Sequence, residues 1–79
     1  METLGQFLKR EREFRGVALE TVAKTTKISP TFLKYIESDQ WNSLPKGSFV
    51  KGFLRAYAQS VGLNVNEVLT RYQEFQKGG

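Results

Sequence analysis

The sequence contains no cysteine and no histidine among its 79 residues. Without cysteine there is no disulfide framework, and without either residue type the usual zinc sites have no ligands. The same gap removes the side chains that most often act as nucleophile, general acid or general base. The few carboxylates are scattered over charged helical faces, and no glycine-rich phosphate loop is present. We therefore expect a non-catalytic domain without a metal or a cofactor.

Long hydrophobic runs are missing as well. No apolar stretch approaches the roughly 20 residues that span a bilayer, and the charged, amphipathic segment 1–16 does not read as a secretory signal. The sequence predicts one domain over residues 1–76 that makes no membrane contact itself. Residues 77–79 are interpreted as the start of a linker or as an artificial chain end, and we expect a longer parent protein.

Apolar residues recur at intervals of three and four, which is the spacing of amphipathic helices. This periodicity predicts an all-α fold of five helices without a sheet. We expect Trp41 and Leu44, in the loop before the fourth helix, to fold back onto the core. The expected helices cover residues 3–15, 19–26, 30–38, 48–61 and a segment that starts at Asn64. The inner faces of the first and last helices are predicted to be Leu4, Phe7, Leu8 and Phe14, and Val68, Leu69, Tyr72 and Phe75.

Several helix ends have recognisable signals. Ser29 is an expected N-cap, whereas Ala18 offers no side-chain acceptor at the start of the second helix. Gly62 is expected to end the fourth helix in the left-handed conformation. Asn64 and Glu67 have the spacing of a capping box for the fifth helix.

The segment 18–37 has the pattern of a helix-turn-helix, with two short amphipathic helices around a tight turn. The small side chain of Ala23 lets the two helices approach closely where they cross, and Ile28 lies in the turn. The motif usually implies DNA. The apolar faces of the two helices are Leu19, Val22 and Ala23, and Leu33 and Ile36.

If the second helix of this motif entered a major groove, it would present Ser29, Thr31, Lys34 and Tyr35 to the bases. This set lacks the Arg, Asn and Gln side chains that read bases in bidentate fashion. In the segment 18–39 three lysines are balanced by three acidic residues, so its net charge is zero. We therefore expect weak or non-specific DNA binding at most. Partial burial of Tyr35 against the neighbouring loop is the alternative for that residue.

The helix at 48–61 carries an apolar arc about 180° wide, although a surface helix needs only about 100°. Phe49 and Phe53 lie four residues apart at one edge of the arc and therefore share a face. Exposed aromatic side chains are typical anchors of protein interfaces. The alternative is that both rings belong to the core.

Positive charge gathers on the same element. Lys46, Lys51 and Arg55 lie in the segment 46–63, which has no acidic residue, so three charges of the net +4 are found there. Such a surface suits an acidic protein partner.

Residues 4–72 resemble the N-terminal cytoplasmic domain of the RodZ family, a variant of the Cro/C1-type helix-turn-helix. The most specific part of the resemblance is KGFLRAYA at residues 51–58, after the Leu-Pro pair at 44–45. Generic repressor domains share only the first three helices. The other matching segments are residues 4–8, 12–16, 22–28, 35–37 and 62–63.

The resemblance implies a membrane-anchored cell-shape protein whose cytoplasmic domain binds the bacterial actin MreB, at the cytoplasmic face of the inner membrane. It implies that the aromatic residues of the fourth helix, here Phe49 and Phe53, contact MreB. It also implies a structural ion pair between Arg12 and Glu37.

Three functions follow as hypotheses. The first is a RodZ-like module that docks on MreB through Phe49 and Phe53, with Lys46, Lys51 and Arg55 as steering charges. The second is a Cro/C1-type transcriptional regulator that reads DNA with its third helix. The third is a docking domain for some other protein.

Overall fold

A computed structural model describes residues 1–45 and 47–78 of the chain. In these residues it contains five α-helices, one short 3-10 helix and no strand, which confirms the all-α prediction. The four bounded helix predictions agree with the structure to within one residue at each end. The elements are α1 (Leu4–Phe14), α2 (Leu19–Thr26), α3 (Pro30–Glu37), η1 (Trp41–Ser43), α4 (Phe49–Val61) and α5 (Val65–Gly78).

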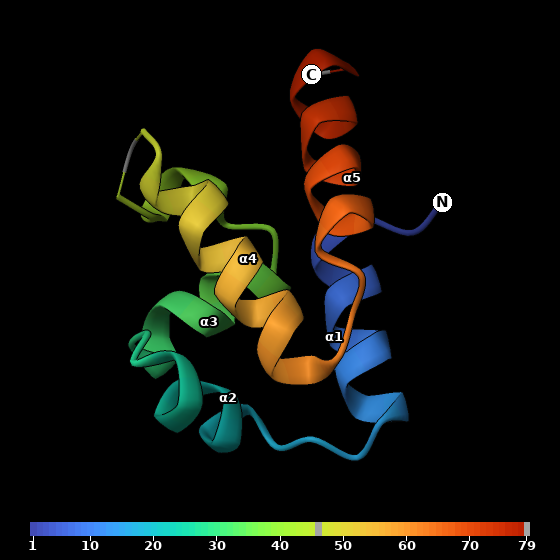
Figure 1. Ribbon diagram of the computed structural model, residues 1–79. Coiled ribbons are helices and arrows are strands. Elements are labelled where there is room, and N and C mark those ends of the chain that lie inside the picture. Colours follow the sequence, from blue (N-terminus) through green and yellow to red (C-terminus); the bar gives the residue numbers. More distant parts are fainter. Residues whose placement is uncertain (46, 79) are drawn as a thin grey trace.

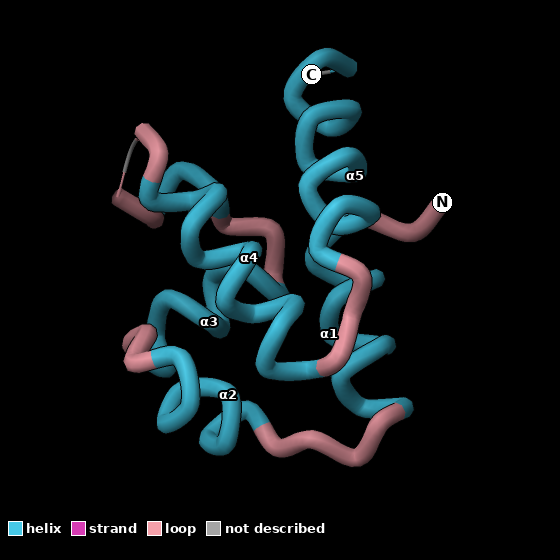
Figure 2. Tube along the Cα trace, in the orientation of Figure 1, coloured by secondary structure: helices cyan, strands magenta, loops and turns pink. Residues whose placement is uncertain are grey.

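The helices surround a central α4. This helix packs against α2 and α5, while α1 packs against α3 and α5. In Figure 1, α4 crosses the middle of the molecule diagonally, and the last turns of α5 extend beyond the rest of the bundle. Figure 2 shows that α2 and α3 are joined by a short turn, whereas a longer loop connects α1 to α2. The α2–turn–α3 unit is the predicted helix-turn-helix.

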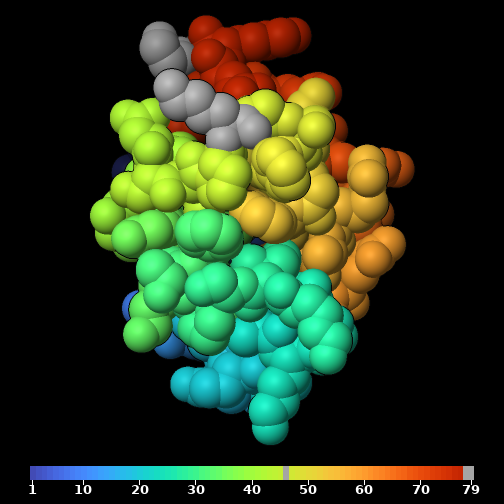
Figure 3. Space-filling model, turned by 90° about the vertical axis from the view of Figure 1, so that its left-hand side faces the viewer, coloured from blue at the N-terminus to red at the C-terminus, as the bar shows by residue number. Residues whose placement is uncertain are grey.

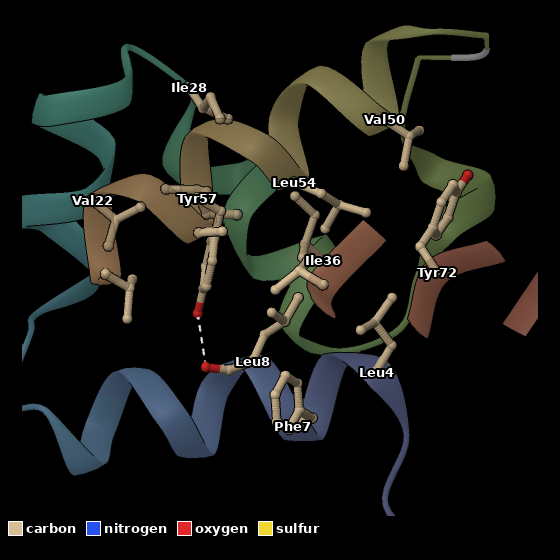
Figure 4. Packing of buried hydrophobic residues seen from close by; sticks show 14 of the residues in the cluster. Leu4, Phe7, Leu8, Val22, Ile28, Ile36, Val50, Leu54, Tyr57 and Tyr72 are labelled. Atoms are coloured by element: carbon tan, nitrogen blue, oxygen red, sulfur yellow. Dashed lines mark hydrogen bonds between the residues drawn. The ribbon is translucent and has the colours of Figure 1, made fainter. Parts of the chain in front are cut away.

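One hydrophobic core holds these helices together. Side chains from all five helices converge in it, as Figure 4 shows for Leu8 of α1, Ile36 of α3 and Leu54 of α4. Each of these three side chains is fully buried. Burial of a leucine or isoleucine contributes about 1.5–3 kcal/mol, so the packing of these faces is the main source of stability.

The predicted helix ends are observed. The Ser29 hydroxyl accepts a hydrogen bond from the Thr31 amide at 3.2 Å, and Ala18 makes no side-chain cap. Gly62 ends α4 with a φ of 93°. The next amide, of Leu63, donates to the Ala58 carbonyl at 2.8 Å, which is the Schellman pattern. At α5, the Asn64 side chain accepts from the Glu67 amide at 2.9 Å, which is one of the two hydrogen bonds of the predicted capping box.

The loop before α4 folds back as predicted. Leu44 is buried in the core, and the Trp41 ring lies 5.8 Å from both the Tyr72 and the Phe75 rings. Pairs at this distance stabilise aromatic clusters. The loop is thereby attached to α5.

Two predictions about inner faces are wrong. Phe14 is 84% exposed and Phe75 is 46% exposed. Phe14 is the last residue of α1, and Phe75 lies near the end of α5. Helix α5 continues through Gly78, and the interpretation of residues 77–79 as a linker start or chain end stays a prediction. Gly79 lies outside the described residues.

A buried polar network joins α1, α3 and α4. Arg12 donates to Glu37 from Nε at 2.7 Å and from Nη2 at 3.0 Å, so the ion pair implied by the resemblance is present. The third donor, Nη1, reaches the Val17 carbonyl at 2.8 Å. The Tyr57 hydroxyl lies 2.6 Å from Glu37 Oε2 and 3.1 Å from the Leu8 carbonyl oxygen (Figure 4). Tyr57 thereby fixes α4 to the other two helices.

Tyr57 makes stability sensitive to alkaline pH. Burial, together with the hydrogen bond to Glu37, raises the pKa of Tyr57 well above its ordinary value of 10.0. The folded protein thus holds the phenolic proton more tightly than the unfolded chain, so this stabilisation is complete below about pH 10 and is lost as the pH rises.

We expect Tyr57→Phe to reduce that alkaline loss. Urea denaturation at about pH 9 and pH 11 gives the unfolding free energy of each protein at both pH values. The decrease in this free energy from pH 9 to pH 11 is expected to be smaller for the variant than for the unchanged protein. Equal pH dependence of the two proteins would contradict the assignment.

Candidate protein-docking surface

The first turns of α4 expose aromatic side chains. Phe49 is 61% exposed, although it begins a helix whose other large apolar residues are buried or half-buried. Phe53, one turn later, is half-buried, and the centroids of the two rings are 6.4 Å apart. The interpretation that both rings belong to the core therefore fails for Phe49.

Helix α3 extends this aromatic surface. The Phe32 ring lies 5.8 Å from Phe53 and 6.5 Å from Tyr35. The four side chains Phe49, Phe53, Phe32 and Tyr35 are called the aromatic row from here on. In Figure 3 the green atoms of α3 and the yellow atoms of α4 lie side by side on one face of the molecule.

Phe32 is a residue that the sequence analysis missed. The core face of α3 is formed by Leu33 and Ile36, and Phe32 lies beside it, half-buried. An available signal was its spacing of three residues from Tyr35, which places the two rings on neighbouring positions of the helix surface.

Exposed basic side chains lie on the same two helices as the aromatic row. Lys51 and Arg55 of α4 and Lys34 of α3 are all exposed. The ion pairs found among the described residues involve none of these three cations. Glu37 of α3 is buried against Arg12 and adds no negative charge to the surface. Lys46, the other predicted steering residue, lies outside the described residues.

The residues predicted to read DNA separate into two groups. Ser29, Thr31 and Lys34 are exposed at the start and along the outer side of α3. The Ser29 hydroxyl oxygen accepts the cap hydrogen bond, which leaves its O–H group as a donor. Tyr35 is half-buried and belongs to the aromatic row. The candidate protein surface and the candidate DNA surface therefore share two residues, Lys34 and Tyr35.

Other kinds of site find little support in the described part of the chain. Residues 1–45 and 47–78 contain no group of three or more acidic side chains that could hold a metal ion. No helix among them is long and apolar enough to cross a bilayer.

Comparison with known proteins agrees with this architecture. A family model described as a helix-turn-helix domain matches residues 7–68. The chain belongs to this helix-turn-helix domain family. Members of such a family are binding modules rather than enzymes, in agreement with the expectation of a non-catalytic domain.

A relative of this helix-turn-helix domain is the cytoskeleton protein RodZ of Streptococcus pneumoniae. The two are 32% identical over 71 residues, which make up 90% of this chain and 26% of the relative. The chain therefore spans about a quarter of the length of the curated relative it matches. No solved structure matches. The resemblance to RodZ stated from the sequence motifs is thus supported over nearly the whole domain.

Proposed function

We propose that this domain is the docking module of a RodZ-like cell-shape protein and that it binds the bacterial actin MreB through the aromatic row. The observation that carries the proposal is Phe49. This ring is 61% exposed at the end of the aromatic row, on a helix whose exposed cations make no ion pair among the described residues. The proposed setting is the cytoplasmic face of the membrane that anchors the parent protein.

The aromatic row supplies affinity in this proposal. Burying a phenylalanine side chain contributes about 1.5–3 kcal/mol, and a few aromatic residues usually carry most of the energy of an interface. Phe32 packs against Phe53, which restricts the rotamers of Phe53 in the free domain and so reduces the side-chain entropy lost on binding.

The cations supply orientation and association rate. Lys51 and Arg55 lie on the outer side of α4, and Lys34 lies on the adjoining helix. Positive charge at these positions attracts an acidic filament surface and excludes a basic one. Since exposed charges are screened by salt, we attribute to them a salt-dependent association rate rather than most of the affinity.

Phe49→Ala is expected to weaken binding to MreB filaments by about 30-fold, which corresponds to roughly 2 kcal/mol for an interface anchor. Adding Phe53→Ala weakens it further. Co-sedimentation with filaments measures the effect, and circular dichroism checks the fold.

The matched control is Phe14→Ala. Phe14 is also an exposed phenylalanine, at 84%, but it ends α1 and lies outside the aromatic row. Its replacement leaves binding unchanged if the row is the docking surface. Equal binding by the Phe14 and Phe49 variants would rule the site out.

The family match also favours a second candidate, a Cro/C1-type DNA-binding regulator that uses Ser29, Thr31, Lys34 and Tyr35. A salt titration of duplex binding separates the two functions. Tight, sequence-dependent binding at about 150 mM salt supports a regulator. Weak binding that disappears with salt supports the docking module.

A further inference from the structure

No contact or backbone angle within the folded domain requires a glycine at position 52 of α4. It is the fourth of the thirteen residues of this helix, and it is exposed. A Cβ atom added at this position would meet no other atom within 4 Å. Glycine inside a helix destabilises the folded state relative to alanine, because it loses more backbone freedom on folding.

At several other positions the structure explains why the residue is glycine. Gly16, Gly47 and Gly62 adopt positive φ angles, which favour glycine. A Cβ on Gly5 would lie 2.6 Å from the Ile36 carbonyl oxygen, so the contact between α1 and α3 requires its absence. Neither a backbone angle of this kind nor a neighbouring atom accounts for Gly52.

The neighbours of Gly52 on the surface of α4 belong to the proposed docking surface. On a helix, residues three positions apart are surface neighbours. Phe49 and Arg55 therefore flank Gly52, one on each side along the helix. The glycine leaves bare main chain between an exposed ring and an exposed cation, both of which belong to the proposed docking surface.

We propose that Gly52 is the point at which the docking partner approaches the main chain of α4 most closely. The inference rests on the proposed function and refines it. In this arrangement an apolar ridge on the acidic surface of the partner crosses α4 over Gly52. The ridge contacts Phe49 on one side of the glycine, and a carboxylate of the partner faces Arg55 on the other side. A side chain at position 52 holds this ridge away from the helix.

The experiment uses Gly52→Ala and Gly52→Leu in binding to purified MreB filaments. In the free domain, Gly52→Ala raises the Tm by about 4 °C, because it improves helix propensity at a site with open space. The same variant binds filaments at least tenfold more weakly, and Gly52→Leu binds below detection. Stability and binding thus change in opposite directions, which a purely structural role for Gly52 does not produce.

Thr70→Ala is the matched control. Thr70 is exposed on α5, and its replacement also improves helix propensity, but it lies outside α4 and the aromatic row. It raises the Tm while leaving filament binding unchanged.

The outcomes separate this inference from the proposed function. Undiminished binding by both Gly52 variants, beside weakened binding by Phe49→Ala, overturns the role of Gly52 and keeps the docking surface. A lower Tm for Gly52→Ala also overturns that role, since it reveals an intramolecular reason for the glycine. If neither Phe49→Ala nor the Gly52 variants weaken binding, the proposed function and the inference fail together.

Discussion

Replacing Glu37 with alanine is expected to destabilise the domain by about 3–5 kcal/mol. The variant leaves the Arg12 guanidinium buried without its carboxylate, and an uncompensated buried charge carries a cost of this size. The Tyr57 hydroxyl also loses its shorter hydrogen bond. Small domains have only about 5–15 kcal/mol of stability in total, so urea denaturation should show a large shift of the midpoint. A loss below about 1 kcal/mol would contradict this account.

The double variant Arg12→Met with Glu37→Leu tests the physical reason. Exchanging both partners of a buried ion pair for apolar residues of similar volume is often neutral or stabilising. Tyr57 keeps the Leu8 carbonyl as an acceptor in this background. We therefore expect its stability to lie close to that of the unchanged protein and far above that of Glu37→Ala.

Gly5→Ala is expected to have the second largest effect, with a loss of roughly 2 kcal/mol. A Cβ at position 5 would lie 2.6 Å from the Ile36 carbonyl oxygen and 2.8 Å from that of Glu37. These are backbone atoms and cannot rotate away, so α1 and α3 must separate, and overpacking of this kind costs about 1–3 kcal/mol.

Thermal unfolding followed by circular dichroism measures the change, with a Tm lower by about 10 °C for a domain of this size. Gly52→Ala serves as the comparison, because the same substitution at an open helix position raises the Tm. An unchanged or raised Tm for Gly5→Ala would show that the contact between α1 and α3 can relax.

The sequence predicted the helices well because their signals are local. Apolar spacing indicated each helix, and Ser29 and Gly62 marked ends through hydrogen bonds within a few residues. The ion pair between Arg12 and Glu37 could be predicted only from the resemblance to a family. Its two residues are 25 positions apart, so no local pattern connects them.

The errors at Phe14 and Phe75 have a common cause. Helical periodicity gives the direction in which a side chain points, but not whether another element covers that level of the helix. Both residues lie on the predicted face and near the end of a helix. At those levels the covering is incomplete: Phe75 meets the Trp41 ring on one side and stays 46% exposed, and Phe14 stays 84% exposed.

The aromatic row could be predicted only in part. The wide apolar arc of α4 identified Phe49 and Phe53 from the sequence. The contribution of Phe32 and Tyr35 depends on how α3 packs beside the start of α4, which is a tertiary contact without a sequence pattern of its own.

The polar network around Tyr57 has a mechanical consequence. Apolar contacts have no preferred direction, but hydrogen bonds of 2.6–3.0 Å are directional and resist sideways displacement. A pull applied at the first turn of α4 therefore passes along that helix to Tyr57 and then, through Glu37 and Arg12, into α1. The same bonds hold α1, α3 and α4 in fixed relative positions, so the first turn of α4 keeps a defined orientation toward the N-terminal helix.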